Sequence, residues 1–358
     1  MRLGRALLVR LGALGDTILA SSVAGLLKNN FPGIEVDFLA SAGLEGLFTM
    51  IPEVTEVCGV PFRRLPLAVH PVLRRRLRSL NQRGYDLAVL LETSPRFLPL
   101  LNAIRADQKL ALGLPDERGQ PAEGLPVPIR YQRLLWDRGI VAQEVCYPRL
   151  VVRKQDEERA FTLLSVLGLD PSRPLIGLHP GNSFRTRKKW RRWLKKADLR
   201  SWPEKRWLDL VHGIHRFSGD VQFVLFGSAQ DRPVNARIER NLRKDLPGLR
   251  IASSAGRTDL PLAAALLSRF SLFVATDTGP LHMAAALKVP LVGLYGPTRF
   301  EETGPFTDQP KASTIRRSMP CQPCYGGPLQ RTCMSNRCMQ EIRAEEVLQL
   351  VVQMDVLS

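Results

Sequence analysis

The stretch LFVATDTGPLHMAAA, residues 272–286, predicts how the surrounding chain folds. Its first four residues are apolar and favour a buried strand, and the alanine-rich run at its end favours a helix. The polar residues 276–279 between them predict a turn. A strand that passes directly into a helix in this way is the repeating unit of an α/β fold with a parallel sheet.

The same order of strand, loop and helix recurs on both sides of this stretch. Residues 17–29 carry apolar side chains at helical spacing, so we expect a helix there. Further strands are predicted at residues 7–9, 36–39, 87–91, 175–178, 221–226 and 291–294. We therefore expect two doubly wound, Rossmann-like domains that face a central cleft, with ligands at the carboxyl ends of the strands.

A helix expected over residues 156–167, ended by Gly168 and Pro171, separates the two series of strands. The predicted domains are therefore 1–160 and 173–340, with a final helix at 341–358 that could cross back to the first domain. The chain has 358 residues, of which 44% are hydrophobic and 24% charged. This balance excludes wholesale disorder and suits a protein of two domains.

We expect neither a membrane-spanning helix nor a secretion signal. The longest apolar segment, residues 260–275, is interrupted by Arg269. The apolar run at the N-terminus resembles a secretion signal, but Arg10 and Asp16 interrupt it, so a buried strand is expected instead. The resulting expectation is a cytoplasmic protein whose cysteines stay reduced.

The net charge of +17 is concentrated in two segments. Residues 63–83 hold seven Lys or Arg and no acid, and residues 185–206 hold eleven against two acids. These segments either form solvated faces or contact an anionic partner, and four tryptophans near the second segment suit a membrane interface or a nucleic acid. We favour an anionic lipid surface, because no nucleic-acid recognition motif accompanies the charge.

Four glycine-rich or polar loops follow predicted strands. In RLGALGDT, residues 10–17, Asp16 either caps a helix or acts as a general base. Thr278 and Gly279 offer backbone N–H groups to an anion at a helix N-terminus. Asp277 can hold a sugar hydroxyl or cap that helix, and His282 can donate to a phosphate or be a core side chain. The other donor-binding residues expected are Asn182, Ser183 and Asp231.

Four of the six cysteines lie close together in the sequence. They are Cys321, Cys324, Cys333 and Cys338. A pair two residues apart, with two more cysteines nearby, can surround a structural zinc or iron ion. The alternative is that reduced thiols simply pack a loop.

Residues 10–16, 275–286 and 292–298, together with the clustered cysteines, resemble the ADP-heptose:lipopolysaccharide heptosyltransferases of glycosyltransferase family 9. The resemblance extends from Leu7 to about Val347. It implies a GT-B fold and an inverting transfer of heptose from ADP-heptose to a hydroxyl of the lipopolysaccharide inner core, with no cofactor required. It also implies a Kdo-bearing glycolipid acceptor and a location at the inner face of the inner membrane.

The resemblance also implies roles for individual residues. Asp16 corresponds to the general base, with Gly15 and Thr17 expected at the acceptor, and the turn 277–282 corresponds to the donor site. A lysine before a Trp-Pro pair stabilises the leaving phosphate in that family. Here the position is Arg200, and the alternatives are Lys188, Lys189, Lys195 and Lys196.

Three other functions remain open on the sequence alone. The first is transfer of heptose to a protein, or of another nucleotide-activated sugar to an acceptor. The second is unspecific binding of nucleic acid through the basic segments. The third is binding of a sugar nucleotide without catalysis, against which the presence of both Asp16 and His282 argues.

Overall fold

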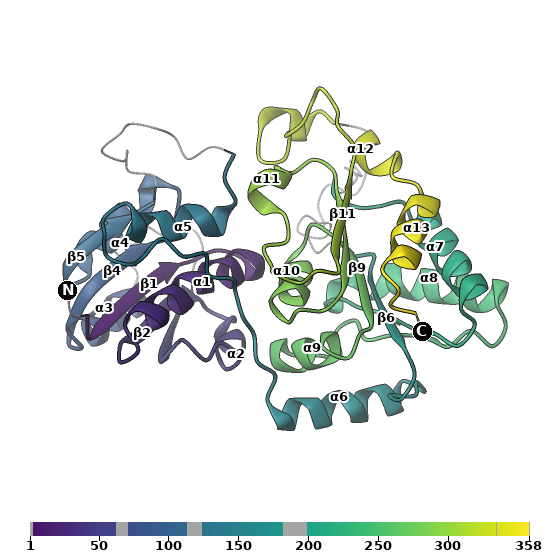
Figure 1. The fold of residues 1–358 in the computed structure, drawn as a ribbon, viewed down its shortest axis with the longest axis horizontal. Coiled ribbons are helices and arrows are strands. Elements are labelled where there is room, and N and C mark those ends of the chain that lie inside the picture. Colours follow the sequence, from purple (N-terminus) through teal and green to yellow (C-terminus); the bar gives the residue numbers. More distant parts are fainter. Residues whose placement is uncertain (1–2, 62–70, 113–123, 182–198, 334, 358) are drawn as a thin grey trace. The chain divides into compact units, whose positions relative to one another are not determined.

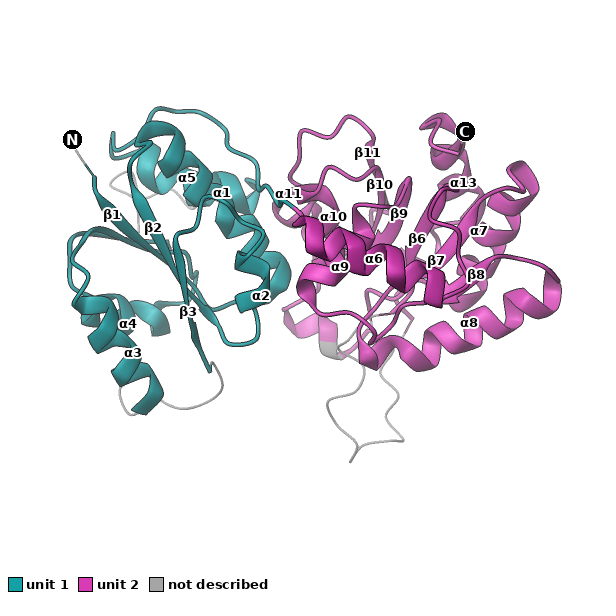
Figure 2. Ribbon diagram, turned by 90° about the horizontal axis from the view of Figure 1, so that it is seen from below, with its two compact units in different colours: residues 1–151 teal, residues 152–358 magenta. Residues whose placement is uncertain are grey.

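The computed structural model describes residues 3–61, 71–112, 124–181, 199–333 and 335–357. The chain divides into two compact units, 1–151 and 152–358 (Figure 2). Each unit is built around a sheet in which every strand pairing among the described residues is parallel. The α/β class that the sequence predicts is therefore confirmed.

Unit 1 has the strand order β3-β2-β1-β4-β5 in its described part. Figure 2 shows α1 and α5 on one face of this sheet and α3 and α4 on the other. The strands are β1 (Arg5–Arg10), β2 (Glu35–Ser41), β3 (Glu56–Val60), β4 (Tyr85–Leu90) and β5 (Ala106–Ala111). The helices are α1 (Leu14–Asn30), α2 (Glu45–Phe48), α3 (Pro71–Asn81), α4 (Leu98–Ala103) and α5 (Val127–Trp136).

Unit 2 has the order β11-β10-β9-β6-β7-β8 in its described part. Figure 1 shows α9 and α10 on one side of this sheet and α7, α8 and α13 on the other. The strands are β6 (Leu175–His179), β7 (Gln222–Leu225), β8 (Ile251–Ser253), β9 (Leu272–Thr276), β10 (Leu291–Tyr295) and β11 (Ala312–Arg316). The helices are α6 (Lys154–Val166), α7 (Glu204–Phe217), α8 (Arg232–Asp245), α9 (Leu260–Leu267), α10 (Gly279–Ala286), α11 (Phe300–Thr303), α12 (Arg337–Gln340) and α13 (Ala344–Gln353).

The central strands are buried because helices cover both of their faces. Residues 6–9 of β1 and all five residues of β9 are buried, which explains why their sequences are continuous apolar runs. At the C-terminus, α13 packs against α7, and Val347 and Val351 of α13 join the core of unit 2.

Two of the tryptophans near the second basic segment have a structural role rather than the interfacial one suggested by the sequence. Trp202 and Trp207 are almost completely buried, and their rings meet edge to face at 4.9 Å. The indole N–H of Trp202 donates to the carbonyl of Ile342 at 2.9 Å. These side chains therefore attach the segment before α7 to the C-terminal part of unit 2, and they are unavailable to a membrane or a nucleic acid.

Candidate functional site

The glycine-rich turn after β1 holds Asp16 in a fixed and accessible position. Asp16 is the third residue of α1 and not its N-cap, which is Ala13. One carboxylate oxygen of Asp16 accepts from the Ala13 N–H at 3.1 Å, and the other lies 3.1 Å from the Arg10 guanidinium. The side chain stays 44% exposed. A Cβ on Gly12 would lie 2.8 Å from the Asp16 Cβ, so this turn needs glycine there.

A buried ion pair lies directly behind Asp16. Arg10 is also paired with Glu92, which follows β4, and both of these side chains are largely buried. Glu92 also accepts from the Leu11 N–H at 2.6 Å. Burial raises the pKa of Glu92 overall, although Arg10 and the Leu11 N–H lower it. Neither Arg10 nor Glu92 was identified as a site residue from the sequence.

The two neighbours of Asp16 that were expected at the acceptor are buried. Gly15 lies inside the first turn of α1, and the Thr17 hydroxyl donates to the Ala13 carbonyl at 3.1 Å. The Thr17 side chain is fully buried. The hydroxyl of Thr17 is therefore committed to its own helix, and Asp16 offers the accessible polar side chain of this turn.

The predicted donor turn of unit 2 brings together buried polar groups at the carboxyl end of β9. His282 Nε2 lies 3.7 Å from Asp277 Oδ1, and Arg200 Nη1 donates to the Asp277 carbonyl at 3.0 Å. Burial alone would raise the pKa of Asp277, but His282, Thr298 and Arg200 outweigh it and lower that pKa. Asp277 is therefore held as a carboxylate inside the protein.

His282 has an open hydrogen-bonding position. The side chain is 6% exposed, and its buried Nδ1 atom has no hydrogen-bond partner among the described residues. Buried polar atoms in native proteins normally have a partner. Together with the N-terminus of α10, which begins at Gly279 and follows the N-cap Thr278, this atom suits an anionic ligand when both ring nitrogens carry a proton, because Nε2 faces the Asp277 carboxylate.

His179, at the end of β6, connects two of the predicted donor loops. Its Nδ1 atom lies 3.2 Å from the Thr278 hydroxyl, which also donates to the Thr276 carbonyl. Its Nε2 atom lies 3.9 Å from Asp231. The sequence carries no signal for His179 as a site residue, because its partners Thr278 and Asp231 are distant along the chain.

Asp231 is used within the protein. The carboxylate is buried and accepts from the N–H and the hydroxyl of Ser228, both at 2.8 Å. Burial tends to raise the pKa of Asp231, but His179 and Ser228 together lower it. Asp231 therefore holds the loop that follows β7 beside His179 at the end of β6, and its role at the donor stays a prediction. The other expected donor residues, Asn182, Ser183 and Lys188, lie outside the described residues.

The metal site expected at the cysteines is not supported by the structure. In the part of the chain that the structure describes, no three His, Cys, Asp or Glu side chains converge to hold a metal ion. Cys321 is exposed and Cys333 half-buried, whereas Cys324 and Cys338 are buried, and Cys338 joins the core of unit 2. Burial and the neighbouring thiols raise the pKa of Cys338 to about 11. The structural zinc or iron site therefore stays a prediction, and reduced thiols that pack a loop remain the alternative.

Known proteins resemble this chain over most of its length. The family model "Glycosyltransferase family 9 (heptosyltransferase)" matches residues 141–330. Lipopolysaccharide heptosyltransferase 2 of Salmonella typhimurium is 31% identical, over 84% of this chain and 85% of that protein. The solved structure of the Escherichia coli ADP-heptose lipopolysaccharide heptosyltransferase II has a TM-score of 0.73 and 26% identity, with 98% of each chain covered.

A further solved structure supports the fold. The family 9 glycosyltransferase of Veillonella parvula has a TM-score of 0.77 at 19% identity, and the match covers 100% of this chain and 99% of that one. These likenesses confirm the predicted GT-B fold of two Rossmann-like domains. In the described residues, we find no helix that combines the length and apolarity needed to cross a membrane.

Proposed function

This chain belongs to glycosyltransferase family 9 and is a glycosyltransferase, and we propose that it transfers heptose from ADP-heptose to a hydroxyl of the lipopolysaccharide inner core. The names of its relatives support the donor and the acceptor. The structural observation that carries the proposal is the buried pair of Asp277 and His282 at the N-terminus of α10. It combines a carboxylate for sugar hydroxyls with donors for a diphosphate.

In the proposed donor site, the diphosphate lies at the start of α10. The N–H groups of Thr278 and Gly279 donate to its oxygens, and so does Nδ1 of His282 when both ring nitrogens carry a proton. Arg200 supplies positive charge for the phosphate that leaves, from a position fixed by the Asp277 carbonyl and by the Tyr325 ring, 4.7 Å away. Preorganised donors of this kind stabilise the charge that develops as ADP departs.

In the proposed reaction, Asp16 is the general base. The acceptor hydroxyl gives its proton to the Asp16 carboxylate while its oxygen forms a bond to the anomeric carbon of the heptose. The bond from that carbon to the β-phosphate oxygen breaks, ADP leaves with the electron pair, and the anomeric configuration inverts. A positioned base contributes roughly 10²–10⁴-fold to such a step. Arg10 and Ala13 fix the Asp16 carboxylate from two sides, which supports this role.

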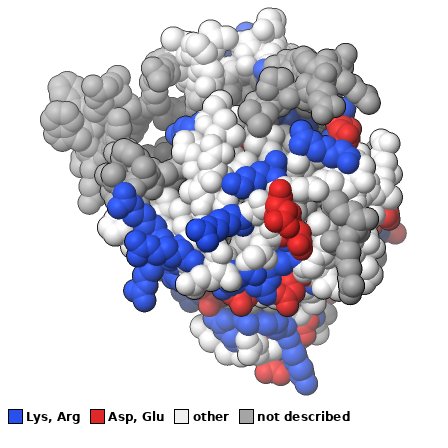
Figure 3. Space-filling view, turned by 90° about the vertical axis from the view of Figure 1, so that its left-hand side faces the viewer, with Lys and Arg blue, Asp and Glu red and all other residues white. Residues whose placement is uncertain are grey.

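The acceptor proposed is a Kdo-bearing, phosphorylated glycolipid at the inner face of the inner membrane. In α3, the arginines at positions 74, 75, 76 and 78 are exposed, and Val72 beside them is 44% exposed. No acidic residue occurs in this helix. On the face drawn in Figure 3, Lys and Arg side chains gather more densely than Asp and Glu. An anionic lipid surface fits a basic helix with an exposed apolar side chain.

The direct test is to incubate the purified protein with ADP-heptose and a series of defined, truncated lipopolysaccharides, and to follow the release of ADP. We expect turnover with an acceptor that carries the Kdo region and none with lipid A alone. Release of ADP from another ADP-sugar at the same rate, or no release with any of these acceptors, would contradict the proposal.

A further inference from the structure

A buried asparagine holds the segment that carries Arg200. The side-chain amide of Asn336 donates to the Ser201 carbonyl at 3.0 Å and to the Leu199 carbonyl at 3.5 Å. These two residues stand on either side of Arg200, the proposed cation for the leaving phosphate. Asn336 is only 6% exposed, and it lies 135 residues beyond Ser201 in the sequence. Its hydrogen bonds therefore fix the backbone of Arg200 from inside the protein.

Asn336 does not use its side chain in the way that is usual for an asparagine at the start of a helix. It is the N-cap of α12, yet within the described residues its side chain makes no capping hydrogen bond to that helix. Its backbone is left-handed, with φ at 35°, a conformation that asparagine adopts more readily than most residues with a side chain. The backbone therefore suits this residue type, and the amide is directed to the segment of Arg200 instead.

The helix that Asn336 precedes is itself fixed to the sheet of unit 2. Cys338 and Met339 of α12 are buried in the core of this unit. A Cβ on Gly296, directly after β10, would lie 2.5 Å from the Met339 sulfur and 3.1 Å from the Cys338 sulfur. Glycine at this position therefore lets α12 approach the end of β10. Since β10 is the neighbour of β9, Asn336 ties Arg200 to the sheet that also carries the phosphate turn.

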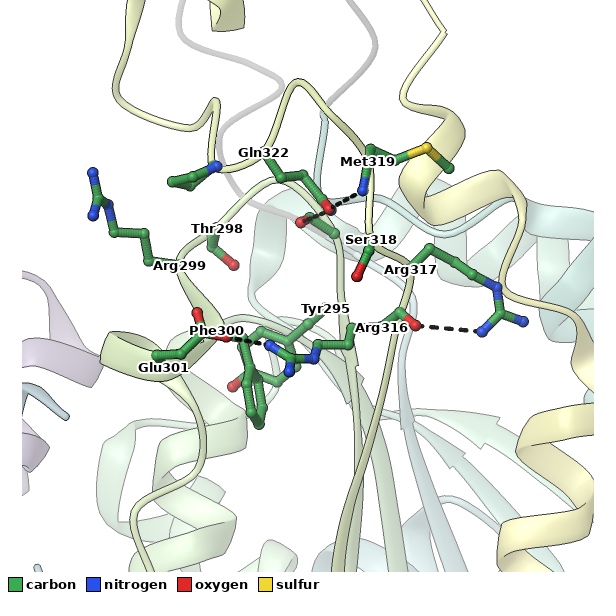
Figure 4. A pocket seen from close by; sticks show the side chains of 12 residues that line it. Tyr295, Thr298, Arg299, Phe300, Glu301, Arg316, Arg317, Ser318, Met319 and Gln322 are labelled. Carbon is green, nitrogen blue, oxygen red and sulfur yellow. Dashed lines mark hydrogen bonds and ion pairs between the residues drawn. The ribbon is translucent and has the colours of Figure 1, made fainter. Parts of the chain in front are cut away.

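A second residue, Tyr325, holds the guanidinium of Arg200. The guanidinium lies 4.7 Å from the centre of the Tyr325 ring, within the range of a cation–π interaction. The Tyr325 N–H donates to the Pro297 carbonyl at 3.0 Å, so the backbone beneath the ring is attached to the turn after β10. Figure 4 shows Gln322, three residues before Tyr325, beside Met319, whose N–H donates to the Gln322 side chain at 2.7 Å. The backbone of Arg200 is therefore held from the start of α12, and its side chain from the turn after β10.

We propose that Asn336 and Tyr325 are positioning residues, which place the Arg200 guanidinium where the departing phosphate gains negative charge. This inference rests on the proposed function, because that function gives Arg200 its role. A cation stabilises the developing charge most when it is already in place, and a misplacement of about 1 Å can cost roughly 10²-fold in rate. A purely structural role for Asn336 would instead lower stability without acting through Arg200.

The test is a double-mutant cycle between Asn336 and Arg200. Asn336→Gly removes the amide and permits the left-handed backbone, and it is made alone and together with Arg200→Ala. Asp355→Gly is the matched control, because Asp355 is also left-handed, with φ at 47°, and is exposed. The measurements are kcat for ADP release, the Kd of ADP, the Kd of AMP and a melting curve. AMP is included because it lacks the phosphate that Arg200 is proposed to contact.

We expect Asn336→Gly to lower kcat by about tenfold and to weaken the binding of ADP but not of AMP, whereas the control should match the wild type. Arg200→Ala should lower kcat by about 100-fold, and the double variant should lose no more than Arg200→Ala alone. A further tenfold loss in the double variant would show that Asn336 acts independently of Arg200 and would overturn the inference. Wild-type kcat and Kd in Asn336→Gly would overturn it as well.

Two variants of Tyr325 give a measurement that does not depend on Asn336→Gly being folded. Tyr325→Leu removes the ring and should lower kcat by about two- to fivefold, and Tyr325→Phe keeps the ring and should recover most of that loss. Equal losses in both variants would overturn the part of the inference that concerns Tyr325.

The inference and the proposed function fail in different ways. If the wild type releases no ADP from ADP-heptose, the proposed function fails. The cycle is then measured by the Kd of ADP, which Asn336→Gly should raise when Arg200 is present and leave unchanged in Arg200→Ala. If the wild type is active but Arg200→Ala keeps its kcat and its Kd of ADP, transfer stands, and the inference is overturned together with the role of Arg200.

Discussion

Asp16 shares one buried cation with a second carboxylate, and this arrangement determines how it can act as a base. Arg10 lies between Asp16 and Glu92, but only Asp16 is substantially exposed, at 44%. Glu92 pairs with one guanidinium nitrogen of Arg10 inside the protein, and another nitrogen contacts Asp16. Arg10 therefore fixes the position of Asp16 and leaves its carboxylate accessible. A general base needs such a combination of fixed geometry and access.

Replacement of Asp16 by Ala is expected to lower kcat by at least about 100-fold, because the proton of the acceptor hydroxyl then has no positioned acceptor. Thermal unfolding should change little, since the side chain is half-exposed and accepts one backbone hydrogen bond, from Ala13, at the start of a helix that other contacts also hold. The measurement is steady-state ADP release together with a melting curve. Normal turnover in a folded Asp16→Ala variant would remove Asp16 from the mechanism.

The buried carboxylate of Asp277 should make stability depend on pH in the acid range. Its folded-state pKa is lowered from the ordinary 3.8, because His282, Thr298 and Arg200 outweigh the effect of burial. The folded state therefore binds fewer protons than the unfolded state, so this stabilisation is fully present above pH 3.8 and is lost as the pH falls through the folded-state pKa.

We therefore expect the difference in unfolding free energy between the wild type and Asp277→Asn to be large at pH 7 and to shrink below about pH 4. Chemical denaturation followed by tryptophan fluorescence at both pH values measures it. Asp220→Asn, whose side chain is 72% exposed, is the control and should show a small difference at both pH values. A difference for Asp277→Asn that stays constant with pH would show that its pKa is not lowered by folding.

The sequence indicated the local motifs of the site but not the residues that meet across the sheet. Asp16, Asp277 and His282 each stand in a short pattern with a glycine turn or a helix start. Arg10 and Glu92, in contrast, are 82 residues apart and meet because β1 and β4 are neighbours in the sheet. Single-sequence patterns carry no information about such pairings, although an arginine at the end of a buried strand was a signal worth following.

At the level of elements, the loops that follow β6 and β7 pack closely around Asp231. A Cβ on Gly181 would overlap the Asp231 carboxylate, which is itself held by Ser228. We expect Gly181→Ala to destabilise the protein by about 1–3 kcal/mol, as overpacking does, and to weaken ADP binding. Gly219→Ala is the control, because a Cβ there meets nothing within 4 Å. Melting curves and the Kd of ADP should separate the two variants, and equal behaviour of both would contradict this account.

The strands predicted from the sequence are the central ones, and the strands that were missed are the edges of the sheets. Among the strands that the structure describes, β3 and β5 are the edges of the sheet in unit 1, and β8 and β11 those in unit 2. β5 has the sequence ADQKLA, with exposed residues at 107–109, and β11 is largely half-buried. β3, β5 and β11 are partly exposed and need no continuous apolar run, so the pattern that marks a buried parallel strand is absent from them. β8 is mostly buried, but with three residues it is too short to show a pattern.

The helix α3 should contribute to binding an anionic membrane. Arg75 and Arg78 are exposed and three residues apart, so they lie on one face of the helix. Each basic residue near a lipid surface contributes about 1 kcal/mol, so Arg75→Gln combined with Arg78→Gln is expected to weaken binding to phosphatidylglycerol vesicles by about 30-fold at low salt.

The matched control for α3 is Arg240→Gln combined with Lys244→Gln, which removes the same charge from exposed positions of α8. Vesicle sedimentation measures both pairs, and added salt should abolish the difference between them. Equal losses for the α3 and the α8 variants would mean that net charge, and not the α3 surface, determines the binding.

On the scale of the whole molecule, the proposed reaction is divided between two units that each have their own sheet and core. The proposed base lies in unit 1, after β1, whereas the proposed phosphate and sugar contacts lie in unit 2, after β9. ADP carries the diphosphate and has no part of the acceptor. This division therefore predicts that the binding of ADP depends on unit 2.

Hydrogen exchange with and without ADP tests this division of labour. At about 100 times its Kd, ADP should stabilise the structure that it contacts by about 2.7 kcal/mol. We expect slower exchange in β9 and α10 of unit 2 and no change in β1 or α1 of unit 1. The Asp16→Ala variant should show the same protection, because Asp16 is proposed to act on the acceptor. If ADP protected β1 and α1 as strongly as β9 and α10, or if Asp16→Ala abolished the protection, the nucleotide site would have to include the turn that follows β1.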